Sequence, residues 1–277
     1  MKILIISDIH ANLDALQAVF SAAGGECDGL LCLGDITGYG SDPSECVALL
    51  KRSSRDFGYC RMLSGNHDAV LWGRLGESWF NPGVLPSIAY TRARLGKDDI
   101  GWLASLPSSF LSPADGTIGT AYLAVHGSPQ EPLTGYLWGG GETVDSLAYL
   151  AVQDIPVCCS GHTHVVSVFS RPGYNPFLPD GSVTVAGSEP VIVNPGGLGF
   201  PRSHGVFSGE SDALGDLDME PEAAGKKSGP SLLITVEAYP AYYAIWDTLA
   251  GTVALRSVRY DRRDFDARCA IAGLANS

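Results

Sequence analysis

The stretch KILIISDIHAN, residues 2–12, decides the fold. Its first half, Lys2 to Ile6, is a short apolar run typical of a buried parallel strand. The run ends abruptly in a polar cluster that contains Asp8 and His10. Asn12 suits the N-cap of a helix, because apolar residues then recur at helical spacing until a pair of glycines. The stretch therefore predicts a first strand-helix unit with polar side chains at the end of its strand.

Predicted strands that end in polar residues recur along the chain. Gly29–Leu33 is predicted as the second strand, and the helix after it is predicted to begin at Asp42-Pro43, with Glu45 at the capping-box position. Three further strands are predicted directly before later motifs of the same kind. The motifs at the strand ends are Gly34-Asp35, Gly65-Asn66-His67-Asp68, His126-Gly127 and Gly161-His162-Thr163-His164.

The remaining segments favour helices first and strands later. Residues 74–107 are predicted to form helices, and a hairpin is predicted to turn near Asp115-Gly116. Residues 208–230 combine acidic side chains with Gly, Ser and Pro, a composition typical of a solvated insertion. Three alternating runs predict a closing β-meander. These runs are Ser231–Glu237, Ala241–Asp247 and Thr252–Val258.

Composition narrows the class of protein. Of the 277 residues, 45% are hydrophobic and 17% are charged, which supports a globular core. No basic leader and no spanning apolar run precedes Asp8, so we expect a cytoplasmic protein without a membrane partner. The net charge of −12 disfavours polymeric nucleic acid, because a long phosphate backbone would be repelled. The seven cysteines lack CxxC spacing and are expected as reduced core thiols.

Histidines gather at the strand ends. Open α/β sheets place ligand sites at the carboxyl ends of their strands, so we expect these segments to meet in one crevice. Asp8 and His10, two residues apart, would point to the same side of an extended segment and could hold one ion. His162 and His164 have the same spacing, whereas His204 is expected in an exposed loop. The five histidines that directly follow predicted strands are His10, His67, His126, His162 and His164.

These residue types predict a pair of metal ions. Mixed carboxylate and imidazole ligands suit Mn, Fe, Zn, Co or Ni better than Ca or a thiolate-dependent site. Two carboxylates with several imidazoles exceed what one tetrahedral ion needs, so two divalent ions roughly 3.5–4 Å apart explain the number of ligands better. We expect Asp35 to bridge them, and we place Mn²⁺ first among the candidate metals.

The five motifs, in their order along the chain, resemble those of the calcineurin-like metallophosphoesterase superfamily, and the later segments resemble its small prokaryotic phosphodiesterase branch. The resemblance implies an α/β fold, a four-layer αββα sandwich of two mixed β-sheets flanked by helices. We expect one metallophosphoesterase domain over residues 1–277, with loop insertions at 170–190 and 205–230 relative to compact members.

The resemblance also implies a role for each site residue. A hydroxide that bridges the two ions would attack phosphorus, and His67 would contact the substrate and protonate the departing alkoxide. Asn12, just past the first motif, is expected to contact the phosphate or to orient a ligand. The implied ligands are Asp8, His10, Asp35 and His164 for the first ion, and Asp35, Asn66, His126 and His162 for the second.

The second motif departs from the protein Ser/Thr phosphatase branch, where it runs G-D-x-x-D-R-G. Here Gly38 and Tyr39 stand in place of the Asp that orients the acid histidine and the Arg that clamps phosphate. We therefore expect a hydrolase of phosphodiesters or small nucleotide-like phosphate esters. A Ser/Thr phosphatase or phosphomonoesterase is the first alternative, and a non-catalytic scaffold is the second.

Several residues keep two interpretations. Asp68 is expected as a helix cap, while Asn194 to Gly199 could be an ordinary turn or a wall of the site's mouth. Tyr136 and Trp138 could stack on a nucleobase, although packing against a neighbouring layer is favoured. The physiological substrate, the native metals and a homo-oligomeric state stay open.

Overall fold

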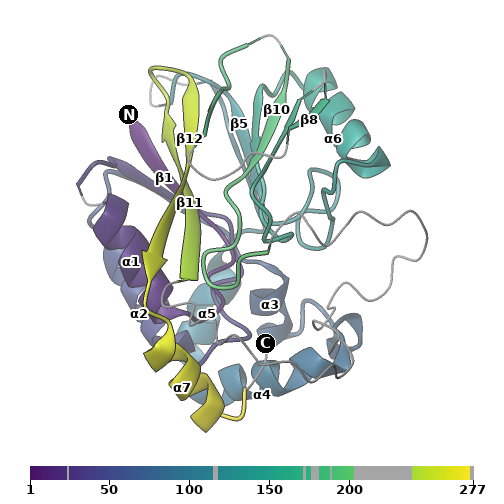
Figure 1. The fold of residues 1–277 in the computed structure, drawn as a ribbon. Helices are drawn as coiled ribbons and strands as arrows, with labels where there is room; N and C mark the ends of the chain where they lie inside the picture. The colour runs from purple at the N-terminus through teal and green to yellow at the C-terminus, as the bar shows by residue number, and fades with distance from the viewer. Residues whose placement is uncertain are drawn as a thin grey trace, which may run out of the picture.

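Two six-stranded mixed sheets pack face to face, with helices on their outer faces (Figure 1). The predicted α/β fold of two mixed sheets flanked by helices is therefore confirmed. No helix in the described part of the chain is long and apolar enough to span a bilayer. The computed structural model describes residues 1–23, 25–114, 118–170, 173–175, 181–187, 189–202 and 239–274.

The first sheet has the strand order β3-β2-β1-β11-β12-β9. Strands β1, β2 and β3 run parallel, and β11 joins β1 antiparallel with Ile3 opposite Trp246. The parallel strands carry their carboxyl ends to one edge of the sheet, which is the edge that the sequence predicts for the site. The strands are β1 (Lys2–Ile6), β2 (Gly29–Cys32), β3 (Tyr59–Met62), β9 (Ser182–Thr184), β11 (Tyr239–Asp247) and β12 (Thr252–Tyr260).

The second sheet has the order β4-β5-β6-β10-β7-β8. Its central strands β5, β6 and β10 are parallel, and antiparallel partners lie on both sides of them. Its parallel strands thus bring a second set of carboxyl ends toward the site. The strands are β4 (Ser109–Ser112), β5 (Tyr122–Val125), β6 (Val157–Cys159), β7 (Ser167–Ser170), β8 (Gly173–Asn175) and β10 (Val191–Asn194).

Helices cover the outer face of each sheet. Helix α6 packs Leu147 and Leu150 on the second sheet, and α1 packs Leu16 and Val19 on the first. The α-helices are α1 (Leu13–Ala23), α2 (Pro43–Ser53), α3 (Asn66–Ala69), α4 (Leu85–Arg94), α5 (Lys97–Ser105), α6 (Gly141–Val152) and α7 (Arg263–Ile271). The 3₁₀ helices are η1 (Val70–Trp72), η2 (Glu77–Trp79) and η3 (Pro82–Val84).

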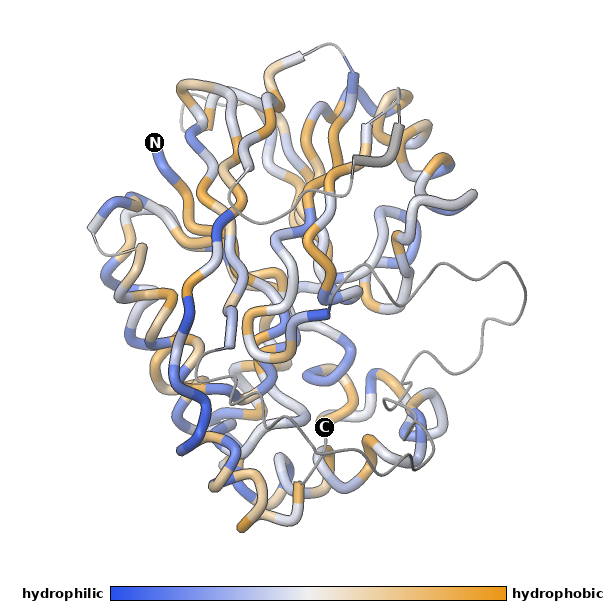
Figure 2. Tube along the Cα trace, in the orientation of Figure 1, coloured by the Kyte–Doolittle hydropathy of each residue, from blue (hydrophilic) through white to orange (hydrophobic). Residues whose placement is uncertain are grey.

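Strand β1 contributes to two core layers. Successive side chains of a strand point to opposite faces. Ile3 and Ile5 therefore enter the layer between the sheets, while Leu4 and Ile6 enter the layer beneath the helices. All four are fully buried, which explains why the run is apolar throughout rather than alternating. Hydrophobic residues likewise follow the buried strands of both sheets (Figure 2).

Some sequence predictions about these elements need correction, and others lie outside the described residues. Asp42 is the N-cap residue of α2 but makes no side-chain capping bond, so the predicted capping box with Glu45 is wrong. Helices α6 and α7 were not predicted. Strand 231–237, the turn at 115–116 and the insertion at 205–230 lie outside the described residues, and so does His204.

Asp42 is instead used in a contact between distant parts of the chain. Nε and Nη2 of Arg268, on α7, donate to the two oxygens of Asp42 at 2.9 Å each. Nη2 also donates to Asp14 on α1 at 2.9 Å. The planar guanidinium thus joins the C-terminal helix to both N-terminal strand-helix units, and its bidentate geometry is the strong form of such a contact.

We predict that Arg268→Ala lowers the free energy of unfolding by about 1–2 kcal/mol, because it removes three charge-assisted hydrogen bonds at a partly exposed site. Urea denaturation measures this loss. Arg263→Ala is the matched control, since the exposed Arg263 side chain pairs with Asp261 two residues away. An equal loss in the two variants would contradict the prediction.

Candidate metal centre

Seven polar side chains meet where strands of both sheets end. Each of them is at most 5% exposed. They follow β1, β2, β5 and β6 or lie at the start of α3. The structure therefore brings together residues that are more than 150 positions apart in sequence. The seven are Asp8, His10, Asp35, Asn66, His126, His162 and His164.

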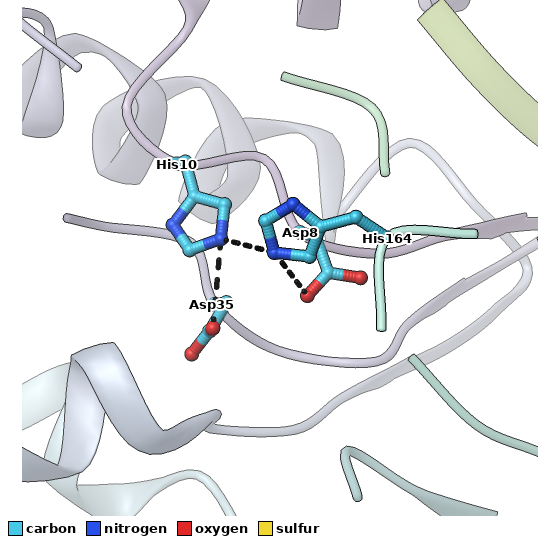
Figure 3. A group of neighbouring side chains, drawn as sticks. All are labelled: Asp8, His10, Asp35 and His164. Carbon is cyan, nitrogen blue, oxygen red and sulfur yellow. Dashed lines mark hydrogen bonds and ion pairs between the residues drawn. The ribbon is translucent and has the colours of Figure 1, made fainter. Parts of the chain in front are cut away.

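Four of them form a first group around facing acceptor atoms (Figure 3). Nε2 of His10 lies 3.0 Å from Nε2 of His164. Nε2 of His164 lies 3.5 Å from Oδ1 of Asp8, and Nε2 of His10 lies 3.6 Å from Oδ2 of Asp35. Two nitrogens and two carboxylate oxygens thus surround one small space.

A second group shares the carboxylate of Asp35 with the first. Nε2 of His126 lies 3.3 Å from Oδ2 of Asp35 and 3.2 Å from Nδ1 of His162. It also lies 2.9 Å from Oδ1 of Asn66. The same oxygen of Asp35 therefore faces an imidazole of each group.

Backbone carbonyls fix the orientation of three of the imidazoles. Nδ1 of His10 lies 3.0 Å from the carbonyl of Thr37. Nδ1 of His164 lies 2.7 Å from the carbonyl of Phe200, and His126 makes the same contact with Leu33 at 3.0 Å. A carbonyl can only accept, so each Nδ1 carries a hydrogen and each ring turns Nε2 toward the cluster, with a lone pair there wherever the ring is neutral.

This arrangement fits metal ions. With Nδ1 protonated, the neutral rings of His10 and His164 would face each other at 3.0 Å through two lone pairs. Near Asp35, Nε2 of His126 faces a carboxylate oxygen and an amide oxygen, both of them acceptors, so this nitrogen must carry either a proton or a metal ion. Lone pairs at such distances repel each other unless a cation lies between them. The donor set of imidazole nitrogens and carboxylate oxygens suits divalent transition metals.

Burial and mutual charge shift the pKa values of these groups. Burial lowers the pKa of His10 and of His162 well below the usual range. Burial and the charge of Arg202 lower the pKa of His164 to about 3. All three rings are therefore neutral at pH 7, the form that binds a metal.

Asp35 and His126 shift each other's pKa in opposite directions. Burial opposes the charge of both groups, but the imidazoles around Asp35, His126 above all, outweigh burial and hold the pKa of Asp35 well below its usual range. Burial likewise opposes the charge on His126, but Asp35 prevails and raises the pKa of His126 to about 9. A proton on His126 thus compensates the Asp35 charge where no other cation does.

The backbone at the ligand positions is left-handed. The φ angles are 54° at Asp8, 47° at His10 and 50° at Asp35. They are 67° at His162 and 61° at His164. The predicted reason for their convergence, alternation along an extended segment, is therefore wrong. Tight turns after the strands aim these side chains instead, and such backbone costs about 1–3 kcal/mol per residue, which the surroundings must offset.

Asp68 holds two of these turns together. Its buried carboxylate accepts hydrogen bonds from the backbone nitrogens of Gly65, Ile36 and Thr37 and from the Thr37 hydroxyl, at 2.8–3.1 Å. Bonding to Gly65 caps α3, as predicted. Bonding to residues 36 and 37 was not predicted, and it secures the turn that follows Asp35. Burial, then the nearby Asp35 charge, raises the pKa of Asp68 to about 6.

The loop at residues 194–202 packs against the cluster, and its role as a wall of the site's mouth stays a prediction. Backbone nitrogens of Leu198 and Gly199 donate to the carbonyls of Ser7 and Asp8 at 3.0 and 2.9 Å. A Cβ at Gly199 would lie 2.0 Å from the carbonyl oxygen of Ile9, so only glycine permits this approach. The loop thus lies directly against the first metal-binding motif.

Asn12 does not face the site. Its amide donates to the carbonyl of Gly199 at 3.1 Å and to the hydroxyl of Tyr260 at 2.8 Å, and its oxygen accepts from the backbone nitrogen of Ala15. The side chain is fully buried. The predicted N-cap is present, whereas the predicted contact with phosphate is replaced by a structural role in joining α1 to the 194–202 loop.

His67 lies among aromatic rings at the edge of the cluster. Its ring centroid is 4.5 Å from that of Tyr39, 4.8 Å from His10 and 5.1 Å from Phe80. Gly38 has a φ of 90°, and a Cβ there would lie 2.5 Å from Nδ1 of His67. An Asp could not replace Gly38 without a shift of this ring, because no side chain fits at position 38 beside it.

Aromatic rings also flank His162. The Tyr136 ring lies 4.0 Å from the His162 ring, and the Trp79 ring lies 6.1 Å from it. Trp138 stacks near Tyr136 with an interplanar angle of 8°. Tyr136 thus packs against a cluster member, and the choice between nucleobase stacking and packing against a neighbouring layer stays open. Trp79, which is 39% exposed, was missed because its position depends on the packing of η2.

We predict that Asp68→Ala destabilises the EDTA-treated protein by on the order of 3 kcal/mol, because it leaves buried backbone donors at Gly65, Ile36 and Thr37 without their acceptor. Chemical denaturation measures the change. Asp145→Ala, on the exposed face of α6, is the control and should unfold like the parent. A loss below about 1 kcal/mol at position 68 would show that the turns hold without this carboxylate.

Comparison with known proteins places the chain among phosphoesterases. The family model for calcineurin-like phosphoesterases matches residues 1–166. An uncharacterized protein of Methanocaldococcus jannaschii is 32% identical over 202 residues, which cover 72% of this chain and 77% of the relative. A metallophosphoesterase structure from Sphaerobacter thermophilus is 29% identical, with a TM-score of 0.73 over 99% of this chain and 94% of the other. A hypothetical protein of Pyrococcus horikoshii OT3, 17% identical, shares the fold with a TM-score of 0.69 at the same coverage.

The matches and the site agree. The family and the buried group of Asp and His side chains indicate divalent metal ions and hydrolysis of phosphate esters. The match also covers the strand ends that position the cluster. By its sequence and its fold, the chain belongs to the calcineurin-like phosphoesterase family.

Proposed function

We propose that the protein is a two-metal phosphodiesterase that hydrolyses phosphodiesters or small nucleotide-like phosphate esters. The observation that carries this proposal is the position of Asp35. A single oxygen of its carboxylate faces an imidazole of each ligand group, at 3.6 Å from His10 and 3.3 Å from His126. A carboxylate shared in this way suits a pair of ions better than one ion.

We assign the ligands by group. Asp8, His10 and His164 would hold the first ion, Asn66, His126 and His162 the second, and Asp35 both. Two divalent ions bound there supply Lewis acidity toward phosphate oxygens and lower the pKa of water. We expect manganese as the native metal and the cytoplasm as the compartment.

His67 would act as the general acid that protonates the departing alkoxide. Its backbone nitrogen donates to Oδ1 of Asp35 at 2.9 Å, which fixes the start of α3 next to the bridging carboxylate. The rings of Tyr39 and Phe80 pack around the imidazole and limit its rotation. Positioning by packing thereby replaces the orienting carboxylate that the second motif lacks.

The diester preference rests on charge. The second motif carries Tyr39 rather than an arginine, so it supplies no guanidinium for a doubly charged monoester. A diester phosphate carries one negative charge and needs less compensation. A Ser/Thr phosphatase or phosphomonoesterase would show the opposite preference, and a scaffold would show no turnover.

The proposed function predicts an activity that depends on bound metal. After EDTA treatment the protein should hydrolyse neither substrate, and Mn²⁺ should restore hydrolysis of bis-p-nitrophenyl phosphate ahead of p-nitrophenyl phosphate. In His67→Ala, kcat should fall by about 10²–10⁴-fold while the metal content stays unchanged, because an acid and not a ligand is removed. Monoester preference would favour the phosphatase alternative. No hydrolysis of either substrate with two metal ions bound would favour the non-catalytic scaffold.

The proposed ligand set predicts how many metal ions the parent and a ligand variant bind. The parent should bind two Mn²⁺ per chain, and His162→Ala should retain one tightly bound ion, since His162 belongs to the second group alone. Inductively coupled plasma mass spectrometry after desalting measures the ratio. His204→Ala, the histidine outside the cluster motifs, is the control and should keep two. Two tightly bound ions in His162→Ala would remove this residue from the ligand set.

A further inference from the structure

The second motif supplies no positive charge for the substrate phosphate, so the proposed metals are the cations that it leaves there. The chain carries a net charge of −12, which opposes the approach of any phosphate ester. The position that supplies an arginine in the Ser/Thr phosphatase branch is occupied by Tyr39, and the preceding Gly38 lies against His67. The guanidinium must therefore come from another segment if one is used.

The 194–202 loop delivers an arginine to this place. The backbone nitrogens of Gly197 and Arg202 both donate to the carbonyl of His164 at 3.1 Å. Between them, the carbonyl of Phe200 accepts from Nδ1 of the same histidine at 2.7 Å. Three contacts with one cluster residue thus fix the loop, and the Arg202 backbone begins directly beside the cluster.

The ring of Phe200 marks the side of the cluster on which the loop lies. Its centroid is 6.0 Å from the His10 ring and 5.4 Å from the Tyr39 ring. The loop therefore passes beside the residue that replaces the missing arginine. Arg202, two residues further on, starts from this edge with a long and half-buried side chain.

The Arg202 side chain starts beside the cluster. Its backbone nitrogen lies 3.1 Å from the carbonyl oxygen of His164, and the side chain is half-buried. From this position the long side chain of an arginine can reach a phosphate bound beside that ligand. The planar fork of arginine matches two phosphate oxygens, which a lysine cannot reproduce.

We propose that Arg202 grips the non-bridging oxygens of the substrate phosphate and takes the place of the guanidinium that the second motif lacks. This inference rests on the proposed function, because it assigns the phosphate of the same substrate to the same centre. A guanidinium there would bind the phosphate of either ester class, so this inference does not itself select diesters. It explains why three hydrogen bonds hold the loop against His164.

Substitution at Arg202 tests this assignment. Its contact with His164 runs through the backbone nitrogen, so a change of side chain leaves that hydrogen bond in place. Arg262 provides a matched control, because its guanidinium stacks on Phe200 at 5.1 Å and also pairs with Asp266. Both changes remove one positive charge from the same region.

The experiment is calorimetric titration of the Mn²⁺-loaded protein with inorganic phosphate, together with the metal content of each variant. We expect Arg202→Gln to keep two Mn²⁺ per chain and to weaken phosphate binding by about 10- to 100-fold. Arg202→Lys should recover part of the affinity, because it restores the charge without the fork. Arg262→Gln should bind phosphate within about 3-fold of the parent, since additive surface effects are small.

The outcomes separate this inference from the proposed function. Unchanged phosphate affinity in Arg202→Gln would overturn it, and so would loss of metal in that variant, which would make the side chain a support of the ligands. Phosphate binding that depends on Arg202 in a protein that hydrolyses no ester would support the inference and refute the function. Hydrolysis of diesters with phosphate binding unchanged in Arg202→Gln would support the proposed function and refute the inference about Arg202.

Discussion

The repulsion between acceptor atoms that face one another in a buried space is the constraint on which the site depends. His10 and His164 approach through unprotonated nitrogens at 3.0 Å, and both groups turn toward the same oxygen of Asp35. Burial of carboxylates without compensation is costly, so the cluster is stable only with cations or protons inside it. Where no metal is bound, a proton on His126 compensates the Asp35 charge, and the pKa of His126 is accordingly raised to about 9.

The surrounding scaffold serves to keep these atoms facing one another. Five ligand positions adopt left-handed backbone, a conformation that L-residues rarely hold unless their surroundings impose it. Asp68 secures the turn after Asp35, and the 194–202 loop secures His164. Each of these supports comes from a different part of the chain. The two sheets supply the rigid strand ends from which the turns start.

Much of this site could be predicted from the sequence because its signals are local. An apolar run followed directly by Asp or His identifies both a strand and its functional end, and the five motifs gave the correct fold class. The reason for the convergence of Asp8 with His10 could not be predicted, since left-handed turns follow from tertiary contacts. Helices α6 and α7 have weak local patterns: exposed Val144 and Val152 interrupt the polar face of α6. The capping-box pattern at Asp42 was outweighed by Arg268, 226 residues away.

Residues that support the ligands from a distance lay beyond sequence reasoning for the same reason. Asp68 suggests a helix cap in isolation, and its bonds to residues 36 and 37 exist only once β2 and α3 lie side by side. Asn12 lies two residues after the first motif, a position that suggests contact with substrate. Its partners Gly199 and Tyr260 are known only from the fold. Sequence position identifies groups that react, whereas tertiary packing decides which groups hold them.

The central claim is that Asp35 bridges two ions, and electron paramagnetic resonance of the Mn²⁺-loaded protein tests it most directly. Two Mn²⁺ ions about 3.5–4 Å apart and joined by one carboxylate should give an exchange-coupled spectrum at full loading. Asp35→Asn should weaken that coupling. A spectrum of magnetically isolated ions at two Mn²⁺ per chain, or saturation at one ion per chain, would contradict the account.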